Sequence, residues 1–162
     1  MVERQIERGQ VWLEKLLTLL GIPAAVISKE RETPDGELAG WLVIDKTQLT
    51  PDQIKHLIGE DGKSIDSMQY LANALLNIGI DASEQRALTI ELDGYRLKRE
   101  QELFAWANQV IEQVRRTGEE AEMSPLSSAE RRQIHTYLKK SEDLTTESRG
   151  QEPNRRLVVR LR

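Results

Sequence analysis

The chain has 162 residues, of which 38% are hydrophobic and 31% charged, enough for one domain or two small ones. It contains no cysteine and only two histidines, which excludes disulfides, a thiol nucleophile and a cysteine-ligated zinc, so we expect neither a metal nor a cofactor. The charge is uneven. Residues 1–94 hold 9 Lys+Arg and 16 Asp+Glu (net −7), and residues 95–162 hold 14 and 11 (net +3). A polyanionic partner is therefore expected for the second half.

The N-terminal region carries no signal for export or membrane insertion. The most apolar run, residues 16–27, spans about a dozen residues and contains Gly21 and Pro23, whereas a membrane-spanning helix needs about 20 apolar residues. The first ten residues mix acidic and basic side chains, unlike the basic start of a signal peptide. We therefore expect a cytoplasmic protein that does not insert into membranes.

Hydrophobic periodicity in the first half predicts alternating helices and strands. Thr50 followed by Pro51 is a favoured helix start, because the threonine can cap and proline suits the first helical position. The predicted elements are a helix over 3–20, a hairpin of strands 24–28 and 40–45 around a turn at 33–36, helices over 50–58 and 63–77, and a strand at 88–92. The helix over 63–77 is expected to bury Ile65, Met68, Leu71, Ala72, Leu75 and Leu76.

The second half begins after Gly94 with a long predicted helix over 96–117. Residues 119–123 form either a polar edge strand or a linker. Ser127 and Glu130 have the spacing of a capping box, which predicts a helix from there to about residue 140. Segments 144–147 and 156–161 are predicted to form a hairpin. The expected fold class is α+β, with one domain over 1–94 and a two-helix, three-stranded domain over 95–162.

A glycine loop separates the helices predicted at 50–58 and 63–77. Gly59 and Gly62 bracket two residues, and such a loop suits a phosphate, because glycine allows positive φ and the next helix presents free N–H groups. The intervening Glu60 and Asp61 oppose this, since each would cost about 1 kcal/mol at about 4 Å from a phosphate in water. Lys55 or Lys63 could offset part of that repulsion.

Ile58, Gly59, Gly62 and Ile65 match the Ile-Gly-x-x-Gly-x-x-Ile signature of KH domains, and the predicted element order resembles the type II form of that fold. KH domains bind single-stranded RNA or DNA. The resemblance implies that the loop clamps the sugar-phosphate of about four nucleotides while the bases lie in an adjacent apolar groove. Ile58 and Ile65 would anchor the two helices below the clamp.

Arg131 and His135, one helical turn apart, are followed by Thr146 to Gly150 and Glu152 to Arg156. This pattern resembles the Arg-x-x-x-His (R-three-H) domain, which binds single-stranded nucleic acid, over about residues 95–162. A type II KH domain followed by this domain resembles the bacterial Jag family, also called KhpB, of RNA-binding proteins. Many members carry a further N-terminal domain and linker, and we do not expect the roles of that domain here.

The resemblance implies a non-enzymatic protein that binds single-stranded RNA, or single-stranded DNA, as a post-transcriptional regulator or RNA chaperone. We expect Arg131→Ala to lower the salt dependence of binding by a little under one unit. The residues expected to contact nucleic acid are Lys55, Ile58, Gly59, Gly62, Lys63, Arg131, His135, Arg149, Arg155 and Arg156. If both Arg155 and Arg156 lie in a strand, they point to opposite faces and one of them joins His135.

Two other functions fit parts of the sequence. In the first, the N-terminal half is a protein-interaction adaptor whose acidic loop rejects RNA, its partner being another KH protein, and only the C-terminal half binds nucleic acid. The second is nucleotide hydrolysis, because Gly62, Lys63 and Ser64 imitate the end of a phosphate-binding loop; Leu57 stands where that loop needs its first glycine, and no nucleophile and base are paired. Trp12, Trp41 and Trp106 are either base-stacking platforms or, as their apolar positions favour, packing residues.

Overall fold

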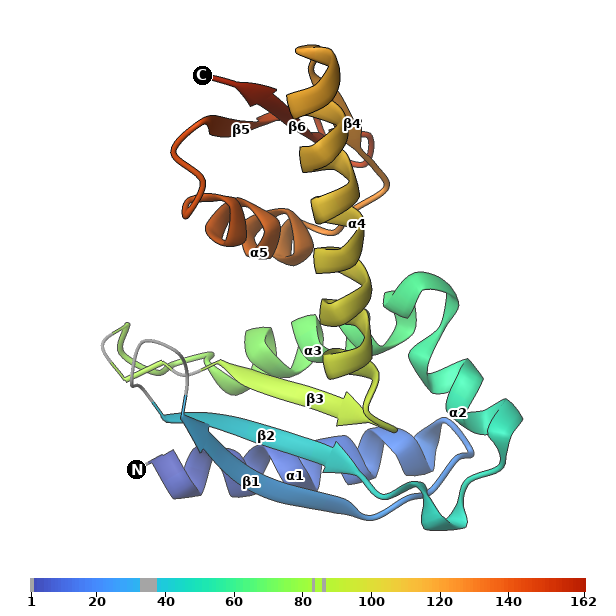
Figure 1. Ribbon diagram of the computed structural model, residues 1–162. Coiled ribbons are helices and arrows are strands. Elements are labelled where there is room, and N and C mark those ends of the chain that lie inside the picture. The colour runs from blue at the N-terminus through green and yellow to red at the C-terminus, as the bar shows by residue number, and fades with distance from the viewer. Residues whose placement is uncertain (1, 33–37, 83, 86) are drawn as a thin grey trace. The chain divides into compact units, whose positions relative to one another are not determined.

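The computed structural model describes residues 2–32, 38–82, 84–85 and 87–162, and the chain divides into two compact units, Met1–Arg96 and Leu97–Arg162. The described residues form five α-helices and two three-stranded sheets, one sheet in each unit (Figure 1). The predicted α+β class is confirmed. The turn predicted at 33–36 lies outside the described residues.

The N-terminal unit has the predicted order of helix, two strands, two helices and a strand. Its elements are α1 (Val2–Leu19), β1 (Val26–Glu32), β2 (Leu38–Ile44), α2 (Pro51–Ile58), α3 (Lys63–Leu76) and β3 (Leu88–Leu92), with a short 3₁₀ helix at Lys46–Gln48 that was not predicted. The sheet order is β1-β2-β3 (Figure 1); β1 pairs with β2 antiparallel, and β2 pairs with β3 parallel. Side chains from α1, α3 and all three strands fill the core of this unit.

One face of α3 packs against the core of the N-terminal unit. Ile65, Met68, Ala72 and Leu76 are buried, but Leu71 and Leu75 are 45% and 46% exposed, so the prediction that these two leucines are buried was wrong. Each residue of a helix is rotated by about 100° from the one before it, so a leucine next to the buried stripe points sideways. The apolar face of α3 is wider than the surface that covers it.

The C-terminal unit contains most of α4 (Tyr95–Thr117), followed by β4 (Ala121–Met123), α5 (Ser128–Leu138), β5 (Leu144–Arg149) and β6 (Arg156–Leu161). Its sheet has the order β4-β6-β5, and β6 is antiparallel to both neighbours (Figure 1). Residues 121–123 are thus an edge strand, which decides between the two alternatives for that segment. Helices α4 and α5 supply Leu103, Ala107 and Ile134 to a core completed by Leu157 and Val159 of β6.

Both predicted helix caps are present. The hydroxyl of Ser127 accepts a hydrogen bond from the N–H of Glu130 at 3.2 Å, and the Glu130 carboxylate accepts one from the N–H of Ser127 at 2.8 Å. Thr50 caps α2, with Pro51 at its first position, and Gln53 completes a capping box there too. These short-range signals therefore fix where α2 and α5 begin.

Candidate nucleic-acid interface

The glycine loop between α2 and α3 is a tight turn in which three residues have positive φ. The φ angles are 76° at Gly59, 53° at Asp61 and 76° at Gly62. A Cβ atom on Gly59 would lie 2.3 Å from Oγ and 2.7 Å from the backbone nitrogen of Ser64. Glycine is required at position 59 both for its φ angle and for the closeness of α3.

The N–H groups of both glycines have acceptors within the chain. Gly59 donates to the carbonyl of Lys55 at 2.9 Å, and Gly62 donates to the carbonyl of Gly59 at 3.3 Å. In this conformation both glycine N–H groups are therefore engaged within the chain. If this loop contacts a polynucleotide, the contact would depend on the shape of the loop and on groups other than these two N–H donors.

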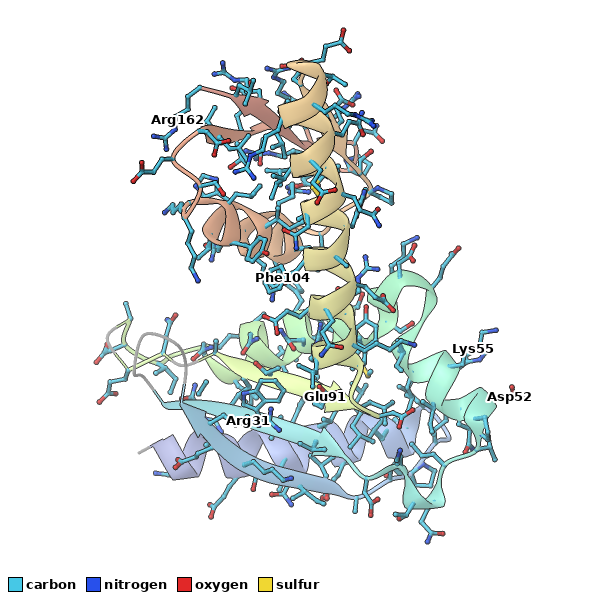
Figure 2. All side chains as sticks on the ribbon, viewed as in Figure 1. Arg31, Asp52, Lys55, Glu91, Phe104 and Arg162 are labelled. Carbon is cyan, nitrogen blue, oxygen red and sulfur yellow. The ribbon has the colours of Figure 1, made fainter. Side chains whose placement is uncertain are left out.

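The charges around the loop are exposed. The side chains of Glu60 and Lys63 are 85% and 73% exposed and lie 3.9 Å apart, so Lys63 offsets part of the acidic charge as expected. Lys55 is exposed in the last turn of α2, and Figure 2 shows its side chain extending outward from that helix. Ile58 is partly buried and packs against the core of the N-terminal unit, which agrees with its expected anchoring role.

In the C-terminal unit, α5, β5 and the segment before β6 enclose an open pocket of about 400 Å³. Its lining residues are Ser128, Arg131, Arg132, His135, Thr146, Glu147, Ser148, Arg155 and Leu157. Three of the predicted site residues, Arg131, His135 and Arg155, therefore meet in one place. The pocket combines three arginines, an imidazole and several hydroxyl groups with one carboxylate, that of Glu147, so cationic groups outnumber the acid and suit an anionic, hydrogen-bonding ligand such as a phosphate.

Arg131 lines this pocket and is only 5% exposed. Its Nη1 donates hydrogen bonds to the carbonyl oxygens of Leu126 at 2.8 Å and Arg155 at 3.3 Å, and its Nη2 contacts the carboxylate of Glu152. The expected contact between Arg131 and nucleic acid stays a prediction, and these bonds engage its guanidinium within the chain. Its guanidinium mainly binds neighbouring segments of the same unit.

His135 is partly buried, and its Nδ1 contacts the hydroxyl of Thr146 on β5. This contact orients the imidazole ring between α5 and β5. No hydrogen bond joins Nε2 to any residue that the structure describes, and so Nε2 is the ring nitrogen available to a ligand in the pocket.

Arg149 and Arg156 lie on the other face of the C-terminal sheet. Arg156 is opposite Arg149 in the strand register, and alternation along β6 separates both from Leu157, which lines the pocket. The structure thus brings Arg155, and not Arg156, to His135. Arg149 and Arg156, although expected to join the site, are separated from it.

Glutamates contact these two arginines, and one of them, Glu147, also lines the pocket. Arg149 makes a two-pronged contact with Glu120 at 2.6 and 2.9 Å and also contacts Glu147, while Arg156 donates to Glu122 at 2.7 Å. The hydrogen bonds from Arg149 hold the pKa of Glu120 below its ordinary value, and the two glutamates raise the pKa of Arg149. Much of the positive charge of this face is neutralised internally.

Arg132 is the pocket residue that sequence reasoning missed. It is exposed on α5 and stands three residues before His135, so both side chains lie on one side of the helix. That spacing is visible in the sequence and could have identified it. Ser128 and Ser148 also line the pocket; Ser148 lies in the Thr146 to Gly150 segment of the motif, whereas no sequence signal distinguishes Ser128 from other surface serines.

Two of the three tryptophans are packing residues. Trp12 and Trp106 are partly buried against the N-terminal and C-terminal cores, respectively. Trp41 instead lies beneath the guanidinium of Arg31, whose Cζ is 4.4 Å from the ring centroid. Among the described residues, no three acidic or histidine side chains are grouped to hold a metal ion, and no helix is long and apolar enough to cross a membrane.

Comparison with known proteins relates the chain to one group of bacterial proteins. Residues 101–161 match the R-three-H (Arg-x-x-x-His) domain family. The chain is similar to the RNA-binding protein KhpB of Clostridium symbiosum, with 31% identity over 114 residues, covering 70% of this chain and 50% of the relative. It is also 32% identical to KhpB of Lactiplantibacillus plantarum, over 65% of this chain and 32% of that relative. With KhpB of Bacillus subtilis the identity is 29%, over 68% of this chain and 53% of that relative. The matched region thus spans about half or less of these relatives.

Proposed function

Because residues 101–161 match the R-three-H domain family and the chain is similar to KhpB proteins, we propose that it belongs to the Jag (KhpB) family and is a non-enzymatic protein that binds single-stranded RNA through two modules. In this proposal residues 1–94 form a type II KH-like domain, and residues 95–162 form the Arg-x-x-x-His domain that contains the family match. The protein would act in the cytoplasm as a post-transcriptional regulator or an RNA chaperone.

The pocket of the C-terminal unit carries this proposal. Arg132 and Arg155 line it, and neither forms an ion pair with any described carboxylate, so both have charge to offer a phosphate. Between them, Nε2 of His135 supplies a hydrogen-bonding group. Arg131 completes the pocket from below by holding the backbone of Leu126 and Arg155 in place.

The glycine loop is proposed to contribute shape rather than charge. The order of helices and strands in the N-terminal unit supports the KH assignment, as do the positive φ angles of Gly59 and Gly62. The backbone of such a loop can come close to a sugar-phosphate, and bases can lie on adjacent apolar side chains. Glu60 and Asp61 make this the weaker of the two contacts.

Anisotropy of a labelled oligouridylate, titrated with the full chain, tests this function. We expect binding that weakens with salt, and His135→Ala should weaken it by about tenfold if the imidazole contacts the strand. Thr136→Ala, one residue further along α5, is the matched control and should bind like wild type. Equal binding by wild type and His135→Ala would remove the pocket from the interface, and a deoxyuridylate competitor would measure the preference for RNA over DNA.

A second function is favoured by a different observation. The glycine N–H groups are satisfied internally, the loop carries exposed acids, and Leu71, Leu75 and Ile78 form an exposed apolar stripe along and just beyond α3. In this alternative the N-terminal unit is an adaptor for another protein, for example a KH protein, and only the C-terminal unit binds RNA.

RNA binding by a fragment of residues 1–96, measured with and without lysines at positions 60 and 61, distinguishes the two functions. Oligouridylate binding by the unmodified fragment supports the clamp. Binding that requires both Glu60→Lys and Asp61→Lys supports the adaptor. Lysines at Asp81 and Glu84, which are exposed in the same unit, control for the change in net charge.

A further inference from the structure

The second glycine of the loop lies directly against the first residue of α4. A Cβ atom on Gly62 would lie 1.9 Å from the hydroxyl oxygen and 2.6 Å from Cζ of Tyr95. Gly62 is itself buried. The ring of Tyr95 therefore occupies the space into which a side chain at position 62 would extend.

Tyr95 is held in place by its own surroundings. It is partly buried and packs against the core of the N-terminal unit. The next residue, Arg96, donates from Nη1 to Asp66 at 2.5 Å and from Nη2 to Gln69 at 2.9 Å, both on α3. Its Nε also donates to the carbonyl of Ile90 on β3 at 3.0 Å. The first turn of α4 is thus fixed to two other elements, and Tyr95 is a firm support.

The two glycines have different supports. Gly59 abuts Ser64 at the start of α3, whereas Gly62 abuts Tyr95, more than thirty positions away in the sequence. Only the second support comes from outside the loop and its flanking helices. Since the loop also satisfies its own glycine N–H groups, its conformation is complete without a ligand.

We propose that Tyr95 is a positioning residue for the glycine loop, holding it in the conformation that receives a single strand of RNA. This inference rests on the proposed role of the loop in RNA binding. A loop that is already ordered loses little conformational entropy when it binds, and so affinity is higher than for a mobile loop of the same composition. Tyr95 contributes to affinity without contacting the RNA.

The first test needs no RNA. Backbone order parameters of residues 59–62 are measured by NMR relaxation in the full chain, where a rigid backbone gives about 0.85 and a flexible one below about 0.6. We expect the rigid value in wild type and in Tyr95→Phe, which keeps the ring, and the flexible value in Tyr95→Leu. Tyr70→Leu, at a tyrosine that is 73% exposed on α3, is the control and should stay rigid. Unchanged loop order in Tyr95→Leu would overturn the proposal.

The second test measures oligouridylate affinity in a double-mutant cycle with Gly59→Ala, which disables the loop by steric conflict with Ser64. Tyr95→Leu should weaken binding by roughly two- to tenfold in the wild-type background and have no further effect in the Gly59→Ala background. An equal loss in both backgrounds would mean a general structural effect and would overturn the proposal. If Gly59→Ala binds like wild type, the role of the loop in RNA binding fails, and the order parameters still decide whether Tyr95 positions it.

Discussion

Nη2 of the Arg131 guanidinium contacts the carboxylate of Glu152, and Nη1 donates to the carbonyl oxygens of Leu126 and Arg155. Arg131 is 5% exposed, and the side chain of Glu152 is 60% exposed. One buried side chain thus links the segment before α5 to the turn between β5 and β6. Arg155, which lines the pocket, is held at its backbone by this link.

Arg131→Ala should lower the stability of the C-terminal unit by about 2–4 kcal/mol, because it leaves two carbonyl oxygens without their donor and Glu152 without its cation. Urea denaturation, monitored by the fluorescence of the tryptophans that include Trp106 in the C-terminal core, measures the loss. Arg132→Ala, at the exposed neighbour, should change stability by less than about 0.5 kcal/mol. Equal effects of the two substitutions would contradict the structural role of Arg131.

The salt dependence of RNA binding should separate the pocket arginines from those on the outer face of the sheet. Each phosphate contact on a single strand contributes a slope of about 0.7 to log affinity against log salt. Arg155→Ala should therefore lower the slope by about 0.7, and Arg156→Ala should leave it unchanged because Glu122 neutralises Arg156. Arg131, neutralised by Glu152, should contribute less than the nearly full unit that its motif suggested.

Features set by nearby residues were predictable from the sequence. The Ser127 and Glu130 capping box and the Thr50 cap depend on residues within one turn, and both are present. The α+β class and the order of elements follow from hydrophobic periods that each segment carries by itself. The alternation argument for Arg155 and Arg156 does not apply, because Arg155 precedes β6 and only Arg156 lies in the strand; Arg155 alone of the two lines the pocket.

Features set by long-range contacts were not predictable. The carboxylate partner of Arg131 is 21 residues away, and Glu120 and Glu122, which contact Arg149 and Arg156, come from the segment around β4, across the sheet. No pattern along the chain distinguishes an arginine that has a carboxylate neighbour from one that has none. The same is true of Tyr95, whose contact with Gly62 exists only once α4 has been placed.

Gly59→Ala should destabilise the N-terminal unit more than Gly79→Ala. Both glycines have positive φ angles, 76° and 73°, so alanine incurs backbone strain at either site, and at Gly59 the ψ angle of 172° places the residue in a region that is essentially restricted to glycine. Only Gly59 also has a neighbour in the way, because nothing lies within 4 Å of a Cβ on Gly79. Gly59→Ala should therefore destabilise the N-terminal unit by about 1 kcal/mol or more beyond Gly79→Ala in urea denaturation. Equal losses would contradict both the steric conflict with Ser64 and the backbone constraint at position 59.

Two ion pairs of the C-terminal unit should make its stability fall in acid. Hydrogen bonds from Arg149 lower the pKa of Glu120, and hydrogen bonds from Arg115 lower the pKa of Asp143. A carboxyl whose pKa is lower in the folded state binds fewer protons there than in the unfolded state. The contribution of such a carboxyl to folding stability is therefore complete at a pH above its ordinary pKa of about 4. This contribution disappears as the pH falls through the lowered pKa of the folded state.

Thermal unfolding of Glu120→Gln and Asp143→Asn between pH 7 and pH 3 checks this dependence. Each variant should be less stable than wild type at pH 7, because its arginine loses a charged acceptor, and the difference should shrink toward zero as the acid pH protonates the wild-type carboxyls. Glu119→Gln, at the exposed residue beside Glu120, is the control and should follow the wild-type curve. A difference that stays constant from pH 7 to pH 3 would mean that the two carboxyls stabilise the fold through something other than their charge.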